Sequence, residues 1–298
     1  MQLARTFLVD TASLASRLGS VTLLDSTWYP PNKSGRPEYE QRRIPSALFF
    51  NIDGVCDPAS PLPHMLPSVA DFSRHMAALQ VSKARPVVVY DSSGLLAAAR
   101  CVFTLTAFGH PDVRLLVGGL PLWVAEGLPV EAGAPPPPPP PLPEEPWALD
   151  AGMVAGLGDV RAASAAVPPG GAPAPHEPLI VDARPAPRFR GEVPEPRPGL
   201  GCGHIPGSRS VPFPTLQRPG FGPLLPPAEA REVLRSAGVD AGRPGRIILS
   251  CGSGVTAPIV WLALAEGGRR ESVALYDGSF AEWGQPSLGL PIETGPAQ

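Results

Sequence analysis

The chain has 298 residues, of which 43% are hydrophobic, and a formal net charge of −3, which suits about two globular domains with cores of their own. The absence of a basic stripe excludes the usual nucleic-acid-binding classes, so no nucleic acid is expected as a partner. The longest nearly apolar run, residues 255–265, is about half as long as a membrane span and contains Pro258, so we expect no transmembrane segment and no membrane partner.

Residues 1–20 are predicted to contain the first helix of a domain, because Leu8, Leu14 and Leu18 are spaced to form one buried face. A mitochondrial presequence is the alternative, since this stretch holds two arginines, several serines and one acidic residue. The four cysteines form no CxxC pair and no secretory signal opens the chain. We therefore expect a reduced compartment, the cytoplasm or the mitochondrion, and not a secreted protein.

Two strand–helix pairs, one in each half, set the predicted fold. Short aliphatic runs at Val87–Tyr90 and 247–249 are typical of buried strands, and each ends in a turn rich in glycine and serine. Each turn leads into an apolar stretch long enough for a helix, residues 95–108 and 255–265. This alternation predicts an α/β fold in which a parallel sheet is flanked by helices. Ligands of such sheets bind beyond the carboxyl ends of the strands.

A cysteine lies at the turn between the second strand and its helix. The N–H groups of a tight loop that contains Gly252 and Gly254 are expected to converge near Cys251, and the helix N-terminus adds partial positive charge. Both effects favour the thiolate over the thiol, which makes Cys251 a candidate nucleophile. Pro258 falls in the first turn of the helix, where a missing N–H costs little. A buried, inert cysteine is the alternative.

The two halves of the chain repeat four landmarks in the same order, at offsets between 157 and 161 residues. The pairs are 23–25 with 180–182, 44–45 with 205–206, 87–94 with 247–254, and 118–123 with 277–283. A period of this length predicts two copies of one domain rather than a solenoid. The first copy has Asp91 where the second has Cys251, so only the second carries the nucleophile.

A proline-rich stretch separates the two copies. Of the 43 prolines, seven form the uninterrupted run 135–141, which predicts a stiff polyproline II segment. We expect a surface linker at 132–148, between a non-catalytic N-terminal domain at 1–131 and a catalytic C-terminal domain at 149–298. A docking site for a proline-binding module is the alternative role of the run.

The sequence Cys-Gly-Ser-Gly-Val-Thr-Ala at 251–257 resembles the active-site loop of the 3-mercaptopyruvate sulfurtransferases, a branch of the rhodanese superfamily. The resemblance covers nearly the whole chain outside the proline-rich linker. Apart from the loop, it rests on segments 24–29, 51–53, 64–67, 188–191, 195–197, 203–207 and 277–283. It implies two tandem rhodanese-like domains, the first inactive, with the site in the interdomain cleft and carried by the second.

The resemblance also implies a sulfurtransferase that uses no cofactor and no metal. The Cys251 thiolate would attack the sulfur of 3-mercaptopyruvate, pyruvate would leave, and a persulfide would remain on the cysteine. A thiol such as thioredoxin, or cyanide in an assay, would then take the outer sulfur. The expected partners are a small-molecule sulfur donor and a thiol acceptor, and we expect a monomer or a weak dimer.

The remaining site residues are carried over from the matching positions of the family. Arg188 and Arg197 match its substrate arginines, whose guanidinium groups suit a carboxylate. Ser253 would orient or relay a proton, and Asp57 and His64 match positions proposed to work with that serine. The other loop residues expected to bind substrate are Gly252, Gly254, Val255 and Thr256. Ordinary structural hydrogen bonding is the alternative role of the aspartate and the histidine.

Three other functions compete with this hypothesis. A thiosulfate:cyanide sulfurtransferase would call for basic residues after the cysteine, whereas Gly252 and Ser253 are neutral. A dual-specificity phosphatase would need an arginine six positions after the cysteine, where this chain has Ala257. A non-catalytic scaffold that recruits partners through the proline run is the third, and the intact cysteine loop argues against it. Nearby, Arg184 and Arg190 are expected to be solvated or salt-bridged surface residues.

Overall fold

The computed structural model describes residues 6–168, 171, 173–220 and 222–296. The chain divides into two compact units, each of which takes a short segment from the other half of the sequence. The first unit comprises Met1–Ala59, Leu66–Asp150 and Arg218–Leu224. The second comprises Ser60–Met65, Ala151–Gln217 and Leu225–Gln298.

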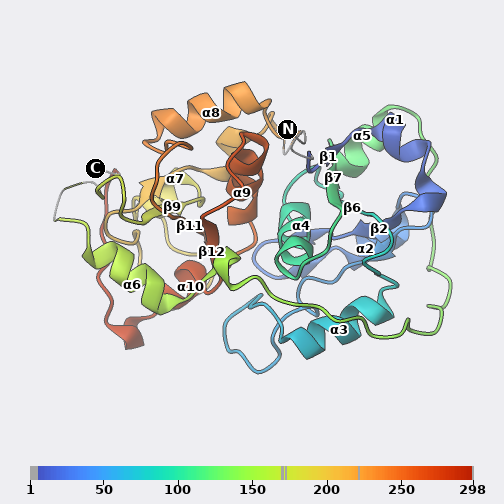
Figure 1. The fold of residues 1–298 in the computed structure, drawn as a ribbon, viewed down its shortest axis with the longest axis horizontal. Helices are drawn as coiled ribbons and strands as arrows, with labels where there is room; N and C mark the ends of the chain where they lie inside the picture. Colours follow the sequence, from blue (N-terminus) through green and yellow to red (C-terminus); the bar gives the residue numbers. More distant parts are fainter. Residues whose placement is uncertain (1–5, 169–170, 172, 221, 297–298) are drawn as a thin grey trace. The chain divides into compact units, whose positions relative to one another are not determined.

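The first unit is built on a five-stranded parallel sheet with the strand order β1-β7-β6-β2-β5 (Figure 1). Its strands are β1 (Leu8–Val9), β2 (Thr22–Asp25), β5 (Leu48–Phe49), β6 (Val87–Tyr90) and β7 (Val113–Leu116), and a small hairpin joins β3 (Trp28–Tyr29) to β4 (Lys33–Ser34). Its helices are α1 (Thr11–Ala15), α2 (Arg36–Gln41), α3 (Val69–Ala78), α4 (Ala98–Ala107) and α5 (Gly119–Ala125), with a 3-10 turn at Leu18–Ser20.

The second unit repeats this architecture with the strand order β10-β9-β11-β12-β8. Its strands are β8 (Val154–Ala155), β9 (Leu179–Asp182), β10 (Arg209–Ser210), β11 (Ile247–Ser250) and β12 (Val273–Tyr276), all paired in parallel. Its helices are α6 (Leu157–Ala165), α7 (Ala186–Phe189), α8 (Pro227–Ser236), α9 (Ala257–Glu266) and α10 (Ser279–Trp283), with 3-10 turns at Ala151–Met153, Phe213–Leu216 and Pro286–Leu288.

The two sheets have the same topology, because β1, β2, β5, β6 and β7 correspond in position to β8, β9, β10, β11 and β12. In each unit the central strands, such as β6 and β11, are buried on both faces, so their sequences are nearly continuous apolar runs. In the second unit α6 and α10 cover one face of the sheet and α8 and α9 lie on the other (Figure 1). The prediction of tandem α/β domains with parallel sheets is confirmed.

The prediction for the N-terminal segment is wrong in one respect. Leu8 belongs to a strand, since Leu8–Val9 pairs with β7, and the first helix is confined to Thr11–Ala15. The Asp10 carboxylate accepts the Ser13 N–H at 2.7 Å and so caps this short helix. Residues 1–5 lie outside the described residues. In the described part of the chain, no helix combines the length and the apolar character needed to cross a bilayer.

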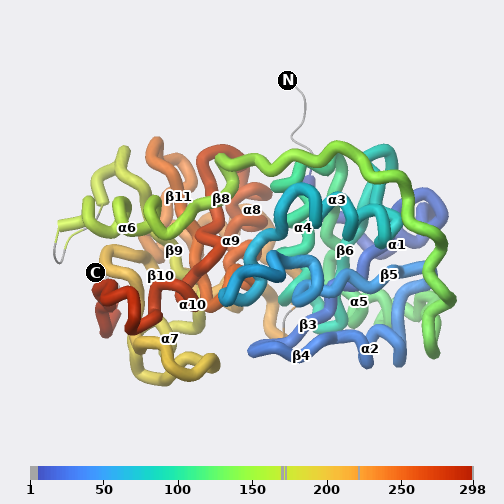
Figure 2. Tube along the Cα trace, turned by 90° about the horizontal axis from the view of Figure 1, so that it is seen from below, coloured from blue at the N-terminus to red at the C-terminus, as the bar shows by residue number. Residues whose placement is uncertain are grey.

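The proline-rich segment after α5 lies along the first unit, and Figure 2 shows it in light green beside α3. The Leu142 N–H donates to Ala77 of α3 at 3.0 Å, and the Gln80 side chain donates to the carbonyl of Pro140 at 2.9 Å. At the far end Trp147 packs edge-on against Phe72, with ring centroids 5.1 Å apart. The segment predicted as a surface linker is therefore fastened to the first unit by backbone and aromatic contacts.

Candidate active site

Cys251 lies directly after β11, at the carboxyl end of the sheet of the second unit, and is 1% exposed. Its backbone N–H donates to the Ser279 hydroxyl at 3.3 Å, and its carbonyl accepts the Phe280 N–H at 3.0 Å. The Ala281 N–H donates to the Gly252 carbonyl at 2.9 Å. The first turn of α10 thus fixes the backbone on which the thiol is mounted.

Ser279 was not singled out from the sequence, although it lies against the cysteine. It is fully buried and has φ of 51°, a left-handed conformation that is uncommon for residues with a side chain. Its hydroxyl donates to the Tyr276 carbonyl at 2.8 Å while it accepts the Cys251 N–H. The sequence offered one signal: at the offset of 160 residues the counterpart of Ser279 is Gly119, with φ of 54°.

Arg188 lies beside the residue that follows the cysteine. A Cβ atom added at Gly252 would stand 2.8 Å from Nη2 of Arg188, so a side chain at this position would displace the guanidinium. Arg188 comes from the short helix α7 and is held by Glu195, whose carboxylate accepts its Nε at 3.0 Å and also its Nη2. The structure therefore brings the predicted substrate arginine next to the cysteine loop.

The prediction that Arg184 is a solvated or salt-bridged surface residue is wrong, because the residue is buried. Its side chain is 0% exposed and lies over the ring of Phe280, 3.7 Å from the centroid. It pairs with the carboxylates of Asp182 and Glu195, at 2.6 Å and 2.8 Å. These two partners satisfy a charge that would otherwise be too costly to bury. Arg190 is half-buried and forms a salt bridge with Glu192 at 2.6 Å, as expected.

His64 belongs to the second unit and lies against the cysteine loop. Its Nδ1 is 3.1 Å from the Ser253 hydroxyl, and both side chains are 4% exposed. His64 has φ of 62°, so the backbone adopts an uncommon conformation where the ring faces the serine. Asp57 is half-buried and accepts the Ala59 N–H at 2.9 Å, a hydrogen bond within its own turn.

The other predicted residues are placed as follows. Gly254 has φ of 76° and Val255 is buried, while Thr256 is the N-cap residue of α9. Arg197 is half-buried, two residues after Glu195. Within the described ranges, no three His, Cys, Asp or Glu side chains converge as metal ligands.

Two of the other cysteines lie in environments that oppose ionisation. Burial raises the pKa of the Cys56 thiol, with nearby Asp53 and Asp57 adding to the effect, and burial alone raises the pKa of the Cys101 thiol. Both thiols therefore keep their protons at neutral pH. We therefore expect neither of them to act as a nucleophile.

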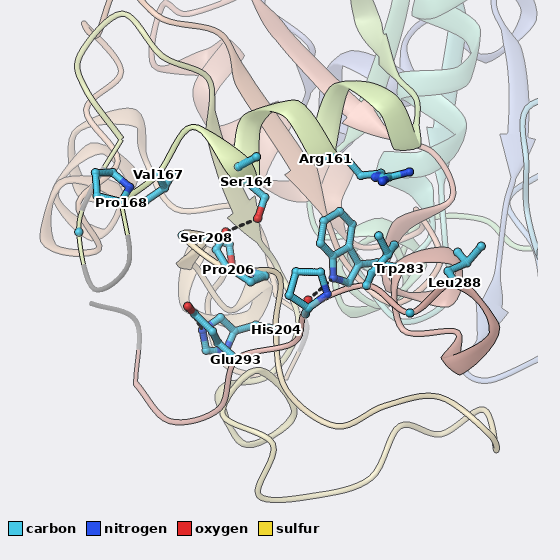
Figure 3. Close-up of a pocket in the computed structure, with 16 residues that line it drawn as sticks. Arg161, Ser164, Val167, Pro168, His204, Pro206, Ser208, Trp283, Leu288 and Glu293 are labelled. Carbon is cyan, nitrogen blue, oxygen red and sulfur yellow. Dashed lines mark hydrogen bonds and ion pairs between the residues drawn. The ribbon is translucent and has the colours of Figure 1, made fainter.

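A separate cavity of about 490 Å³ lies on the side of the second unit where α6 and the C-terminal segment meet (Figure 3). Its lining includes His204 but none of the predicted site residues. The His204 ring stacks on Phe189 at 3.8 Å, and its Nδ1 lies 2.8 Å from the Phe189 carbonyl. Burial lowers the pKa of His204, so the neutral ring donates from Nδ1 and braces α7, which carries Arg188.

Comparison of the sequence with known proteins shows the family to which the chain belongs. A family model described as the rhodanese-like domain matches residues 11–126 and again 171–286. The chain belongs to the rhodanese-like family. The rat protein named 3-mercaptopyruvate sulfurtransferase is 39% identical over 265 residues, which is 88% of this chain and 84% of that protein. These findings make the chain an enzyme of the sulfurtransferase class.

Two further relatives extend the comparison. The Arabidopsis thaliana protein named thiosulfate/3-mercaptopyruvate sulfurtransferase 1, mitochondrial, is 35% identical over 316 residues, covering 96% of this chain and 77% of that protein. The crystal structure of SseA from Escherichia coli, described as a 3-mercaptopyruvate sulfotransferase with the rhodanese fold, superposes with a TM-score of 0.78 at 36% identity. That match covers 92% of this chain and 99% of SseA.

Proposed function

We propose that this chain transfers the sulfur of 3-mercaptopyruvate to a thiol acceptor through a persulfide on Cys251. The observation that carries the proposal is the position of Arg188, whose guanidinium lies at Gly252, the residue next to the cysteine. A guanidinium there suits the carboxylate of a small keto acid, which brings the donor to the thiol. The names of the rat and Escherichia coli relatives support the same donor.

In the first half-reaction the Cys251 thiolate attacks the sulfur of the donor and a new S–S bond forms. The bond between sulfur and C3 of the donor breaks, and its electron pair passes to carbon as the enolate of pyruvate. This enolate takes up the proton that the donor thiol gives up, so pyruvate leaves and a persulfide anion remains. Covalent catalysis of this kind divides one difficult transfer into two easier steps.

In the second half-reaction an acceptor removes the outer sulfur. A dithiol such as thioredoxin is oxidised to its disulfide while hydrogen sulfide and the Cys251 thiolate are released, and cyanide takes the sulfur as thiocyanate. Such chemistry requires a reducing compartment, the cytoplasm or the mitochondrion, and the mitochondrial name of the Arabidopsis relative supports the second.

The neighbours of the cysteine have roles in this scheme. Arg188 and Arg197 bind the donor carboxylate, and the hydroxyl of Ser253 delivers the proton to the leaving enolate. His64, 3.1 Å from that hydroxyl, exchanges the proton with it. The loop residues Gly252, Gly254, Val255 and Thr256 supply the backbone that surrounds the sulfur.

The test is mass spectrometry of the intact chain after incubation with 3-mercaptopyruvate, together with an assay for pyruvate. We expect one added sulfur atom on Cys251 and stoichiometric pyruvate, with neither product from the Cys251→Ser variant. The Cys202→Ser variant, which removes an exposed cysteine, is the matched control and should behave as the unaltered chain. Pyruvate release that survives Cys251→Ser would refute the mechanism.

Thiosulfate is the second candidate donor, because the Arabidopsis relative carries both donors in its name. Comparison of kcat/KM for the two donors decides between them. We expect 3-mercaptopyruvate to be preferred, since Gly252 and Ser253 give the loop no positive charge of its own. A preference for thiosulfate would reverse the assignment.

A further inference from the structure

We propose that Glu195 is a positioning residue that also selects the sulfur donor: it holds Arg188 against the cysteine loop and balances its charge, so that the site favours a monoanion over a dianion. The inference rests on the proposed function, because it concerns the donor of the same reaction. It names a residue that does not touch the donor but acts through one that does.

The positioning role follows from a continuous line of ion pairs. Asp182, at the end of β9, fixes the buried Arg184, and Nη1 of Arg184 donates to Oε1 of Glu195 at 2.8 Å. The Glu195 side chain is 4% exposed and receives Nε and Nη2 of Arg188 on its two oxygens. A paired contact of this kind fixes both the place and the plane of the guanidinium.

Glu195 engages only part of the Arg188 guanidinium, which leaves one nitrogen for a ligand. Its Nε and Nη2 donate to Glu195, and Nη1 donates no hydrogen bond within the described residues. The Arg188 side chain is 20% exposed, so the residue keeps contact with solvent. A Cβ at Gly252 would lie 2.8 Å from Nη2 and 3.9 Å from Nη1, so the edge formed by these two nitrogens lies beside the cysteine loop.

The selective role follows from the balance of charge. Two carboxylates, from Asp182 and Glu195, stand against two guanidinium groups, from Arg184 and Arg188, so the four groups sum to zero formal charge. With these four balanced, Arg197 contributes the one net positive charge assigned to the donor, which matches a single carboxylate. The donor 3-mercaptopyruvate has one carboxylate, whereas thiosulfate is a dianion and gains more from uncompensated positive charge.

The test is the Glu195→Gln variant, which keeps the shape and the accepting oxygen but removes the charge. We expect its ratio of kcat/KM for thiosulfate to that for 3-mercaptopyruvate to rise about tenfold, the effect of one nearby unit charge at moderate screening. The matched control is Glu192→Gln, which neutralises the exposed partner of Arg190 in the same segment. It should leave the ratio unchanged.

If the Glu195→Gln variant folds and its ratio of kcat/KM for the two donors is unchanged, the inference is wrong. If the unaltered chain releases no pyruvate from 3-mercaptopyruvate, the proposed function is wrong instead. Thermal unfolding reports whether the variant folds. A second measurement needs no variant: pyruvate and sulfate are compared as competitive inhibitors of the unaltered chain. We expect the monoanion pyruvate to inhibit at lower concentration than the dianion sulfate, and the reverse order would also refute the selective role.

Discussion

The loops that follow β6 and β11 are copies of one turn, yet one holds a carboxylate where the other holds a thiol. In the first unit Oδ2 of Asp91 accepts three N–H groups, from Leu96 at 2.8 Å, Ala97 at 2.9 Å and Ala98 at 3.0 Å. These donors open α4, whose N-cap residue has no side-chain cap of its own. The aspartate therefore satisfies N–H groups that a helix start leaves without partners.

The same backbone turn surrounds a different chemical group in each unit. Glycines with positive φ occur at the same place in both, Gly94 at 109° and Gly254 at 76°, so the backbone follows a similar path. In the first unit the path ends in a carboxyl group that accepts backbone N–H groups. In the second it surrounds a sulfur atom, which is an anion only as thiolate or persulfide. Pro258 provides no N–H where Ala98 provides one, so the second turn has one donor fewer.

The neighbouring strands β2 and β9 both end in an aspartate, but the two aspartates have different partners. Asp25 ends β2 and accepts the backbone N–H of Thr27 at 2.9 Å, whereas Asp182 ends β9 and pairs with Arg184. The offset of 157 residues makes Thr27 the counterpart of Arg184. The first unit therefore lacks the cation from which the line of ion pairs to Arg188 begins. It retains the fold but not the means of placing a substrate arginine.

The largest expected effect comes from making the second loop like the first. Cys251→Asp should fold, because its carboxylate meets the N–H groups of Thr256 and Ala257, but should lose sulfur transfer by on the order of 10³-fold or more. Turnover of 3-mercaptopyruvate and far-ultraviolet circular dichroism measure the two effects. Residual turnover within tenfold of the unaltered chain would mean that the sulfur is not carried on residue 251.

The reciprocal change removes the anion from the first loop. Asp91→Ala leaves the buried N–H groups at the start of α4 without acceptors, so we expect the free energy of unfolding to fall by about 4 kcal/mol. Urea titration measures this loss, and activity per folded molecule should not change. The matched control is Glu144→Ala, at an exposed position of the same unit. Equal losses in the two variants would show that the carboxylate is not needed by the loop.

The sequence predicted the repeated strands and the cysteine turn because these depend on local patterns. Runs of aliphatic residues end in glycine turns at both copies, and the offset of 160 residues relates them. It did not reveal that Arg184 is buried, because its partner Glu195 lies 11 residues away and is brought close only by the fold. The conformation of Ser279 has a single sequence signal, the glycine at the corresponding position 119, because residues with a side chain rarely adopt positive φ.

The buried aspartate of the first unit should give its stability a pH dependence. Burial raises the pKa of Asp25 from 3.8 to about 6, so the folded state holds a proton that the unfolded state releases. Its contribution to stability therefore decreases as the pH rises from about 4 to 6 and is constant above that range. Asp25→Asn should be the more stable protein by about 3 kcal/mol at pH 7 and by little at pH 4.

Urea titrations of both proteins at several pH values measure this difference. Other carboxyl groups titrate equally in the two chains, so the difference between the chains isolates Asp25. A difference that does not grow between pH 4 and pH 7 would show that the Asp25 carboxyl ionises at its ordinary pH in the folded state.

The smallest effect concerns the serine that contacts the cysteine. Ser279→Gly and Ser279→Ala both remove the hydroxyl that accepts the Cys251 N–H, so each should lower kcat/KM about fivefold, the value of one hydrogen bond. Only glycine relieves the left-handed backbone, as Gly119 does in the first unit, so the glycine variant should be about 1 kcal/mol more stable than the alanine variant. Steady-state kinetics and thermal unfolding separate the two effects. Unequal activities of the two variants would show that loss of the hydroxyl does not account for the change in kcat/KM. Equal stabilities would show that the left-handed backbone at residue 279 is not strained.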